Sequence, residues 1–189
     1  MKYKNRLLRI TCDGGAATGK STGARLIAKK YNLAFLSSGL LYRYAAYLIL
    51  KNKPRNERIF LKNKFRKINY KKLNKINLHT VKISTFSAII AKKLFVRNIL
   101  KKYQLDFIKR NKGCVLEGRD SSTKILPSSD VKFFFVCNLN IAAKRRYKEL
   151  KKNSSKINLL SVKNALKLRN ISDKKRKHSP LKKHKNAIV

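Results

Sequence analysis

Acidic residues are scarce in this chain: its 189 residues include 8 Asp plus Glu against 49 Lys plus Arg, for a formal net charge of +41. Glycine and proline are few, at 7 and 3, which excludes collagen-like and linker-like chains. No apolar run approaches about 18 residues, so we expect no membrane span. The three cysteines cannot all pair, and each lies in an apolar, strand-like run. We therefore expect free core thiols and a cytoplasmic protein.

Lysine and asparagine are abundant, with 35 Lys and 17 Asn against 14 Arg. A pI of about 10.7 is typical of proteins that bind nucleic acid. The same composition is also typical of an AT-rich genome, whose codons favour Lys, Asn and Ile. Because sites that read phosphate with bidentate geometry favour Arg, we favour the compositional explanation and expect no specific nucleic-acid partner.

Short apolar runs alternate with helical patterns along the chain. Strands are expected at 7–12, 34–36, 114–116 and 131–137, helices at 21–31, 40–50, 85–110, 141–152 and 161–171, and the start of a last strand at 187–189. Residues 51–80, rich in Lys and Asn, indicate an inserted, partly irregular region. The alternation predicts an α/β fold with a parallel sheet covered on both faces.

Polar residues follow three of the predicted strands: Asp13-Gly14, Ser37-Ser38-Gly39 and Glu117-Gly118-Arg119-Asp120. Ligands of parallel sheets bind at the carboxyl ends of the strands. This edge of the sheet is therefore the expected site.

The residues after the first strand, Gly14-Gly15-Ala16-Ala17-Thr18-Gly19-Lys20-Ser21, match the phosphate-binding pattern G-x-x-x-x-G-K-[ST] in full, between a strand and a helix. Backbone N–H groups and the helix N-terminus would surround a phosphate, and Lys20 would reach the β- and γ-phosphates. Ser21 or Thr22 can offer a hydroxyl to Mg²⁺, and Ser21 is the candidate metal ligand. The predicted ATP-binding residues are Gly14, Gly15, Ala16, Ala17, Thr18, Gly19, Lys20, Ser21 and Thr22.

Six blocks in order make the chain resemble the bacterial cytidylate kinases, within the P-loop nucleoside monophosphate kinases. They are the Asp13–Thr22 loop, Ser37–Arg43, Phe95-Val96-Arg97, Glu117–Thr123 with Leu126–Asp130, Ala143–Arg146 and Arg169–Arg176. The resemblance implies a three-layer α/β/α P-loop kinase with a parallel sheet. Its core would span 1–50 and 110–189, with a nucleoside monophosphate (NMP)-binding insert at 51–109 and a short lid at 150–162.

The resemblance implies transfer of the ATP γ-phosphate to CMP or dCMP, with Mg²⁺ as the cofactor, by a chain that we expect to be a monomer. Implied CMP-binding residues are Ser38, Tyr42, Arg43, Arg97, Gly118, Arg119, Asp120 and Asp173. Implied catalytic residues are Lys20, Arg119, Arg169, Asp173 and Arg176, and Arg145 and Arg146 would belong to the lid. The chemistry of these residues agrees with the implied roles. A planar Arg guanidinium can donate two hydrogen bonds to a phosphate, and a carboxylate such as Asp120 can accept one from the cytosine amine.

Two alternatives stay open. One is another small P-loop kinase, acting on UMP, AMP or shikimate, which the Ser38–Arg43 and Gly118-Arg119-Asp120 blocks disfavour. Ala88 stands where the family often has a base-contacting Ser and Ser87 is one residue away, which leaves the choice between C and U open. The other is a basic RNA-binding protein with a vestigial P-loop, which the lack of aromatic and Arg clustering on any basic segment disfavours. The resemblance also implies a further strand and helix after Val189, so we expect an open sheet edge.

Overall fold

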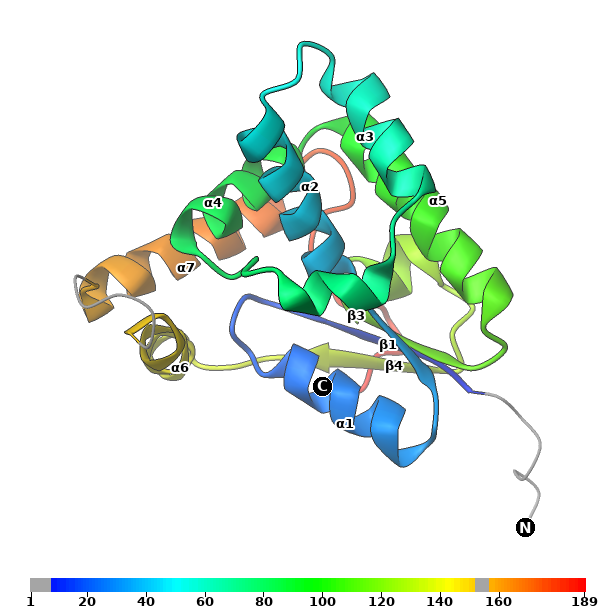
Figure 1. Cartoon of the computed structure of the whole chain (residues 1–189). Coiled ribbons are helices and arrows are strands. Elements are labelled where there is room, and N and C mark those ends of the chain that lie inside the picture. The colour runs from blue at the N-terminus through cyan, green and yellow to red at the C-terminus, as the bar shows by residue number, and fades with distance from the viewer. Residues whose placement is uncertain (1–7, 152–156) are drawn as a thin grey trace.

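A computed structural model describes residues 8–151 and 157–189. Its centre is a parallel sheet in the order β2-β3-β1-β4, built from β1 (Arg9–Gly14), β2 (Ala34–Ser37), β3 (Cys114–Gly118) and β4 (Val131–Phe135) (Figure 1). Asp13 pairs in register with Gly118, and Ser37 with Glu117. The polar ends of three strands therefore meet at one edge, as the sequence predicts.

The alternation of side chains along the strands separates two apolar layers. Ile10 and Cys12 of β1 and Val115 of β3 pack with Ala24 and Ala28 of α1 (Lys20–Lys30) on one face. On the other face Cys114 and Leu116 join a larger core with α2 (Ser38–Asn52) and α5 (Leu94–Arg110). Helices thus cover both faces of the sheet, which confirms the expected three-layer α/β/α arrangement.

The region after α2 is more helical than the sequence suggested. It forms α3 (Glu57–Arg66), the 3₁₀ turn η1 (Tyr70–Lys75), α4 (Val81–Ile90) and α5. Isolated apolar residues in the Lys- and Asn-rich stretch, such as Leu61, Phe65 and Leu73, are buried against α2 and α5. The helical pattern expected over 85–110 is divided at Ala91, whose carbonyl accepts a hydrogen bond from the buried Arg97 side chain.

A short π-helical turn, η2 (Ser121–Ile125), follows β3. Asp13 holds it, because its buried carboxylate accepts hydrogen bonds from the Ser121 and Ser122 amides and from the Ser122 hydroxyl. Burial raises the pKa of Asp13, although the Ser122 and Ser121 bonds oppose that shift. Asp13 therefore anchors η2 beneath the site.

Two further helices, α6 (Leu139–Lys151) and α7 (Leu159–Lys175), pack on each other beside the phosphate loop (Figure 1). Residues 152–156 of the expected lid at 150–162 lie outside the described residues. In place of a last strand at 187–189, Ile188 forms a single parallel bridge with Phe133 on the outer edge of β4. No helix among the described residues is long and apolar enough to cross a membrane.

Candidate active site

The phosphate loop between β1 and α1 has the backbone of an anion cradle. Gly19, at φ 88°, and Ala17, at φ 58°, adopt left-handed conformations that turn successive amides inward. A Cβ at Gly14 would lie 2.3 Å from the Phe135 carbonyl oxygen of β4, so only glycine fits there. The loop is also held from α7, because the Ala16 amide donates to Asn170 Oδ1 at 3.0 Å.

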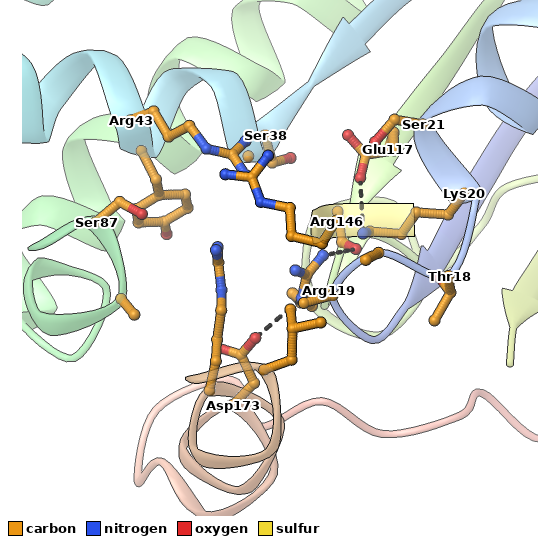
Figure 2. Close-up of a pocket in the computed structure, with 18 of the residues that line it drawn as sticks. Thr18, Lys20, Ser21, Ser38, Arg43, Ser87, Glu117, Arg119, Arg146 and Asp173 are labelled. Carbon is orange, nitrogen blue, oxygen red and sulfur yellow. Dashed lines mark hydrogen bonds and ion pairs between the residues drawn. The ribbon is translucent and has the colours of Figure 1, made fainter. Parts of the chain in front are cut away.

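Lys20 opens α1 and is buried at the strand ends (Figure 2). Its ammonium donates to the Gly15 carbonyl at 3.0 Å and lies 3.4 Å from Glu117 Oε1. Burial, and then the positive charge of Arg119, lower the pKa of Lys20 to about 7. Burial would raise the pKa of Glu117, but the Lys20 charge and the Ser37 hydroxyl bond outweigh it and leave that pKa below its ordinary value. A phosphate at this loop would restore the positive charge of Lys20.

A cavity of about 710 Å³ opens in front of the phosphate loop. Among the sequence-predicted residues it is lined by Ala16, Ala17, Thr18, Gly19, Lys20, Ser21, Thr22, Ser38, Tyr42, Arg43, Gly118, Arg119, Asp120, Arg145, Arg146, Arg169, Asp173 and Arg176. The structure thus brings into one space residues that are up to about 160 positions apart, because the strand ends, α2, α6 and α7 all face it. Gly14 and Gly15 form the base of the loop behind the lining, and Arg97 lies outside the cavity.

Guanidinium groups converge on this cavity with few anions to match them (Figure 2). Among the described residues, the buried Nε atoms of Arg43 and Arg169 have no hydrogen-bond partner. Burial, followed by the Arg146 charge, lowers the pKa of Arg43 to about 10. Burial, followed by the Arg119 charge, lowers that of Arg169 to about 9. A bound polyanion would offset both the cost of burying these cations and their mutual repulsion.

Two carboxylates balance part of this charge. Asp173 of α7 accepts from Arg119 Nε at 3.0 Å and lies 3.4 Å from Arg176 Nη1. Burial would raise the pKa of Asp173, but the Arg119, Arg169 and Arg176 charges together lower it. Asp173, one turn after Arg169 and three residues before Arg176, thus ties α7 to the end of β3.

Asp120 is the second carboxylate. It binds Arg97, the predicted CMP-binding residue that does not line the cavity. Arg97 of α5 donates to Asp120 Oδ2 and stacks 5.6 Å from the Tyr42 ring. Arg176 Nη2 lies 3.7 Å from the other oxygen, Oδ1. Arg97 therefore stands behind Asp120, in a smaller adjoining cavity of about 310 Å³ that Tyr42 and Asp120 also line.

The two predicted lid arginines differ in their surroundings. Arg146 of α6 donates to the His79 carbonyl at 2.9 Å and lies 2.9 Å from Glu149 Oε2, so it joins α6 to the segment before α4. Arg145 is exposed at the rim, with one weak contact to Cys137 Sγ at 3.9 Å. Arg145 is thus the freer of the two to follow a ligand.

Several cavity residues had no role in the sequence prediction, namely Glu117, Ser87, His79 and Glu149. Glu117 had a signal, since it ends a predicted strand beside Gly118 in a chain with few acids. Burial, followed by the Arg43 and Arg146 charges, lowers the pKa of His79 to about 4. Within 8–151 and 157–189 no group of three or more His, Cys, Asp or Glu side chains could hold a metal ion.

A parallel sheet that ends in a phosphate loop, with a buried Lys and converging arginines, defines a P-loop kinase. The cytidylate kinase family model matches residues 10–189. The chain is 38% identical to the cytidylate kinase of Thermosipho melanesiensis over 190 residues, covering 96% of this chain and 87% of that protein. The corresponding values are 37%, 94% and 83% for the Bartonella tribocorum enzyme, and 33%, 96% and 85% for that of Phytoplasma mali. The chain belongs to the cytidylate kinase family.

Proposed function

We propose that this chain is a kinase that transfers the γ-phosphate of ATP to CMP, and also to dCMP, giving CDP or dCDP. The observation that carries the proposal is the surplus of buried cations at the strand ends, with the unpartnered Nε atoms of Arg43 and Arg169. Two nucleotides that meet end to end through their phosphates would neutralise this charge. The family relationship supports cytidine monophosphate as the acceptor.

The donor phosphates belong at the loop. Amides of Ala16 to Lys20 and the N-terminus of α1 would hold the β-phosphate, and Lys20 would leave Glu117 for the β- and γ-oxygens. Glu117 keeps the ammonium at the loop before ATP arrives, because it lies 3.4 Å from it. An oxygen of the acceptor phosphate would attack the γ-phosphorus in line, the bond from that phosphorus to the β–γ bridging oxygen would break, and ADP would leave, so no covalent enzyme intermediate is needed.

The acceptor belongs between α2, α4 and the end of β3. Arg43 and Arg119 would hold the CMP phosphate, with Ser38 and Tyr42 seating the nucleotide. Asp120, oriented by Arg97, would accept from the cytosine amine, and Asp173 would contact the sugar. Arg169 and Arg176 from α7, with the lid arginines Arg145 and Arg146, would neutralise the charge of the transferring group.

The side chains at the phosphate loop fit an Mg²⁺ ion that has few protein ligands. The Ser21 hydroxyl lies on the cavity wall beside Lys20, and Mg²⁺ bound to ATP takes most of its ligands from phosphate oxygens and water. Bound there, the ion would neutralise phosphate charge. Ser21 would hold it, while Lys20 and the loop amides keep the phosphates in line.

We also infer how the parts of the chain cooperate. The insert at 51–109 and the lid at 150–162 would close over the nucleotides and exclude water, and the Arg146 contact with the His79 carbonyl already joins the insert to α6, the helix that leads into the lid. Cys12, Cys114 and Cys137 are free thiols, which supports a cytoplasmic location.

The test is coupled ADP release from the purified chain with Mg²⁺-ATP and CMP, dCMP, UMP, AMP or shikimate. We expect turnover with CMP and dCMP well above that with the other acceptors. Folded protein with no CMP-dependent turnover would contradict the proposal, and a preference for UMP or AMP would move the chain to another acceptor specificity. Circular dichroism of the same sample separates inactivity from misfolding.

A further inference from the structure

A second hollow, of about 1050 Å³, lies between α3 and α5, two helices that run side by side in Figure 1. It shares no lining residue with the active-site cavity. We call it the α3–α5 groove. Its position on the insert leaves it clear of the phosphate loop.

The rim of the groove is cationic. Six exposed cations line it, which are Arg58, Lys62, Arg66, Lys102, Lys109 and Arg110, against one carboxylate, Asp106. Arg58, Lys62 and Arg66 recur every four residues and so form one stripe along α3, about 12 Å long. Within the described part of the chain none of the six has an ion-pair partner, unlike Lys93 nearby, which lies 2.6 Å from Glu57. The rim therefore carries a large excess of positive charge, with Asp106 as the one carboxylate in its lining.

The floor of the groove is aromatic and apolar. Phe95, Ile99 and Tyr103 lie one turn apart on α5 and stay half-buried, and the Phe65 ring packs edge-on to Tyr103 at 6.3 Å. The helix α5 carries Phe95, Ile99 and Tyr103 together with three of the cations, and the packing of α3 beside it adds a second row of cations.

We propose that the α3–α5 groove binds single-stranded RNA without sequence specificity. A cationic groove that follows the backbone, with aromatic side chains against which bases stack, is the chemistry that holds unpaired nucleic acid. An acidic protein segment would need the cations but not the rings. The proposal is independent of the phosphotransfer activity, since the two cavities share no residue.

The experiment measures binding of a labelled oligouridylate to the full chain by fluorescence anisotropy across a salt series. The triple variant Lys62→Gln, Lys102→Gln, Lys109→Gln removes three groove charges. The matched control, Lys71→Gln, Lys72→Gln, Lys75→Gln, removes three exposed lysines from η1, outside the groove. We expect the groove variant to lower the slope of log affinity against log salt by about 2, three phosphate contacts at about 0.7 each, and the control to change it far less.

A second variant separates stacking from charge. Phe95→Leu with Tyr103→Leu keeps the floor apolar and should weaken RNA binding about tenfold, whereas binding of polyglutamate should not change. CMP-dependent turnover of each variant shows that it is folded. Equal slopes for the groove and η1 variants would overturn the proposal in favour of dispersed charge. Polyglutamate binding as tight as RNA binding, with no effect of the ring substitutions, would overturn it in favour of an acidic protein partner.

Discussion

Two groups of cations in this chain have opposite surroundings. Those at or beside the active site are buried, and three of them, Lys20, Arg97 and Arg119, lie within a few ångströms of Glu117, Asp120 or Asp173. Those on the rim of the α3–α5 groove are exposed, and none of them is ion-paired among the described residues. The cations behind the +41 charge therefore fall into two classes. A few of them form the active site, and a larger number lie on the surface.

The difference lies in where the few acids are placed. Four of the eight acids lie at or just after the carboxyl ends of β1 and β3 or on α7, at Asp13, Glu117, Asp120 and Asp173, whereas Asp130 precedes β4 at the opposite edge of the sheet. A buried cation without a counter-charge is costly, whereas an exposed lysine is solvated and screened by salt. Substitutions in the active site should therefore have large effects, and those on the surface small effects.

The largest effect should follow from Lys20→Ala. Loss of the ammonium removes its contribution to the charge that develops on the transferring phosphate, so kcat should fall about a thousandfold. The fold should persist, because the variant removes the cost of burying the Lys20 charge and Glu117 keeps its hydrogen bond from the Ser37 hydroxyl. Steady-state kinetics and a thermal melt test both statements, with Lys30→Ala at the exposed end of α1 as the control. Turnover within tenfold of wild type would remove Lys20 from this role.

The buried carboxylates should be the next most sensitive. Asp173→Asn leaves Arg119 and Arg176 short of an anion, and we expect the free energy of unfolding to fall by about 3 kcal/mol. Glu57→Gln breaks the more exposed pair with Lys93 and should cost about 0.5 kcal/mol.

Urea unfolding of the two variants compares a buried ion pair with a partly exposed one. The m-values should match that of the wild type if only stability changes. Equal losses in the two variants would contradict the distinction between the two groups of cations.

Much of the architecture was predictable from local patterns. The phosphate loop, the four strands and the convergence of their polar ends follow from short apolar runs that end in Gly, Ser or Asp. The division of 85–110 into α4 and α5 was not predictable, because no Gly or Pro lies at the break. The break is marked instead by the hydrogen bond from the Arg97 side chain to the Ala91 carbonyl.

The sequence predicted which residues belong to the candidate site better than it predicted which of them contact each other. Motif order named most of the residues that line the cavity. It did not show that Glu117 faces Lys20, or that Arg97 stands behind Asp120, since both depend on how separate elements pack. The α3–α5 groove was missed for the same reason, because its rings and cations come from two helices.

The pH dependence of stability offers a smaller but specific test. The pKa of Lys20 is about 7 in the folded chain against an ordinary 10.5, so between these values the unfolded chain binds more protons. The free energy of unfolding of the wild type, minus that of Lys20→Met, should therefore rise with pH, by up to about 1.4 kcal/mol per unit. Below pH 7 the difference should be flat. Urea unfolding between pH 6 and 9 measures it, and a flat difference throughout would mean that the Lys20 pKa is not lowered.

The smallest effect should come from the groove lysines. Lys62→Gln, Lys102→Gln and Lys109→Gln together should change the free energy of unfolding by no more than about 0.5 kcal/mol, since these side chains are exposed. The sign should be stabilising at low salt, because six like charges along one groove repel, and the gain should vanish at high salt as screening removes the repulsion. Thermal melts at two salt concentrations, beside the Lys71, Lys72 and Lys75 control, measure it. A loss above about 1 kcal/mol would show that the lysines hold α3 and α5 together, and the groove would then be structural.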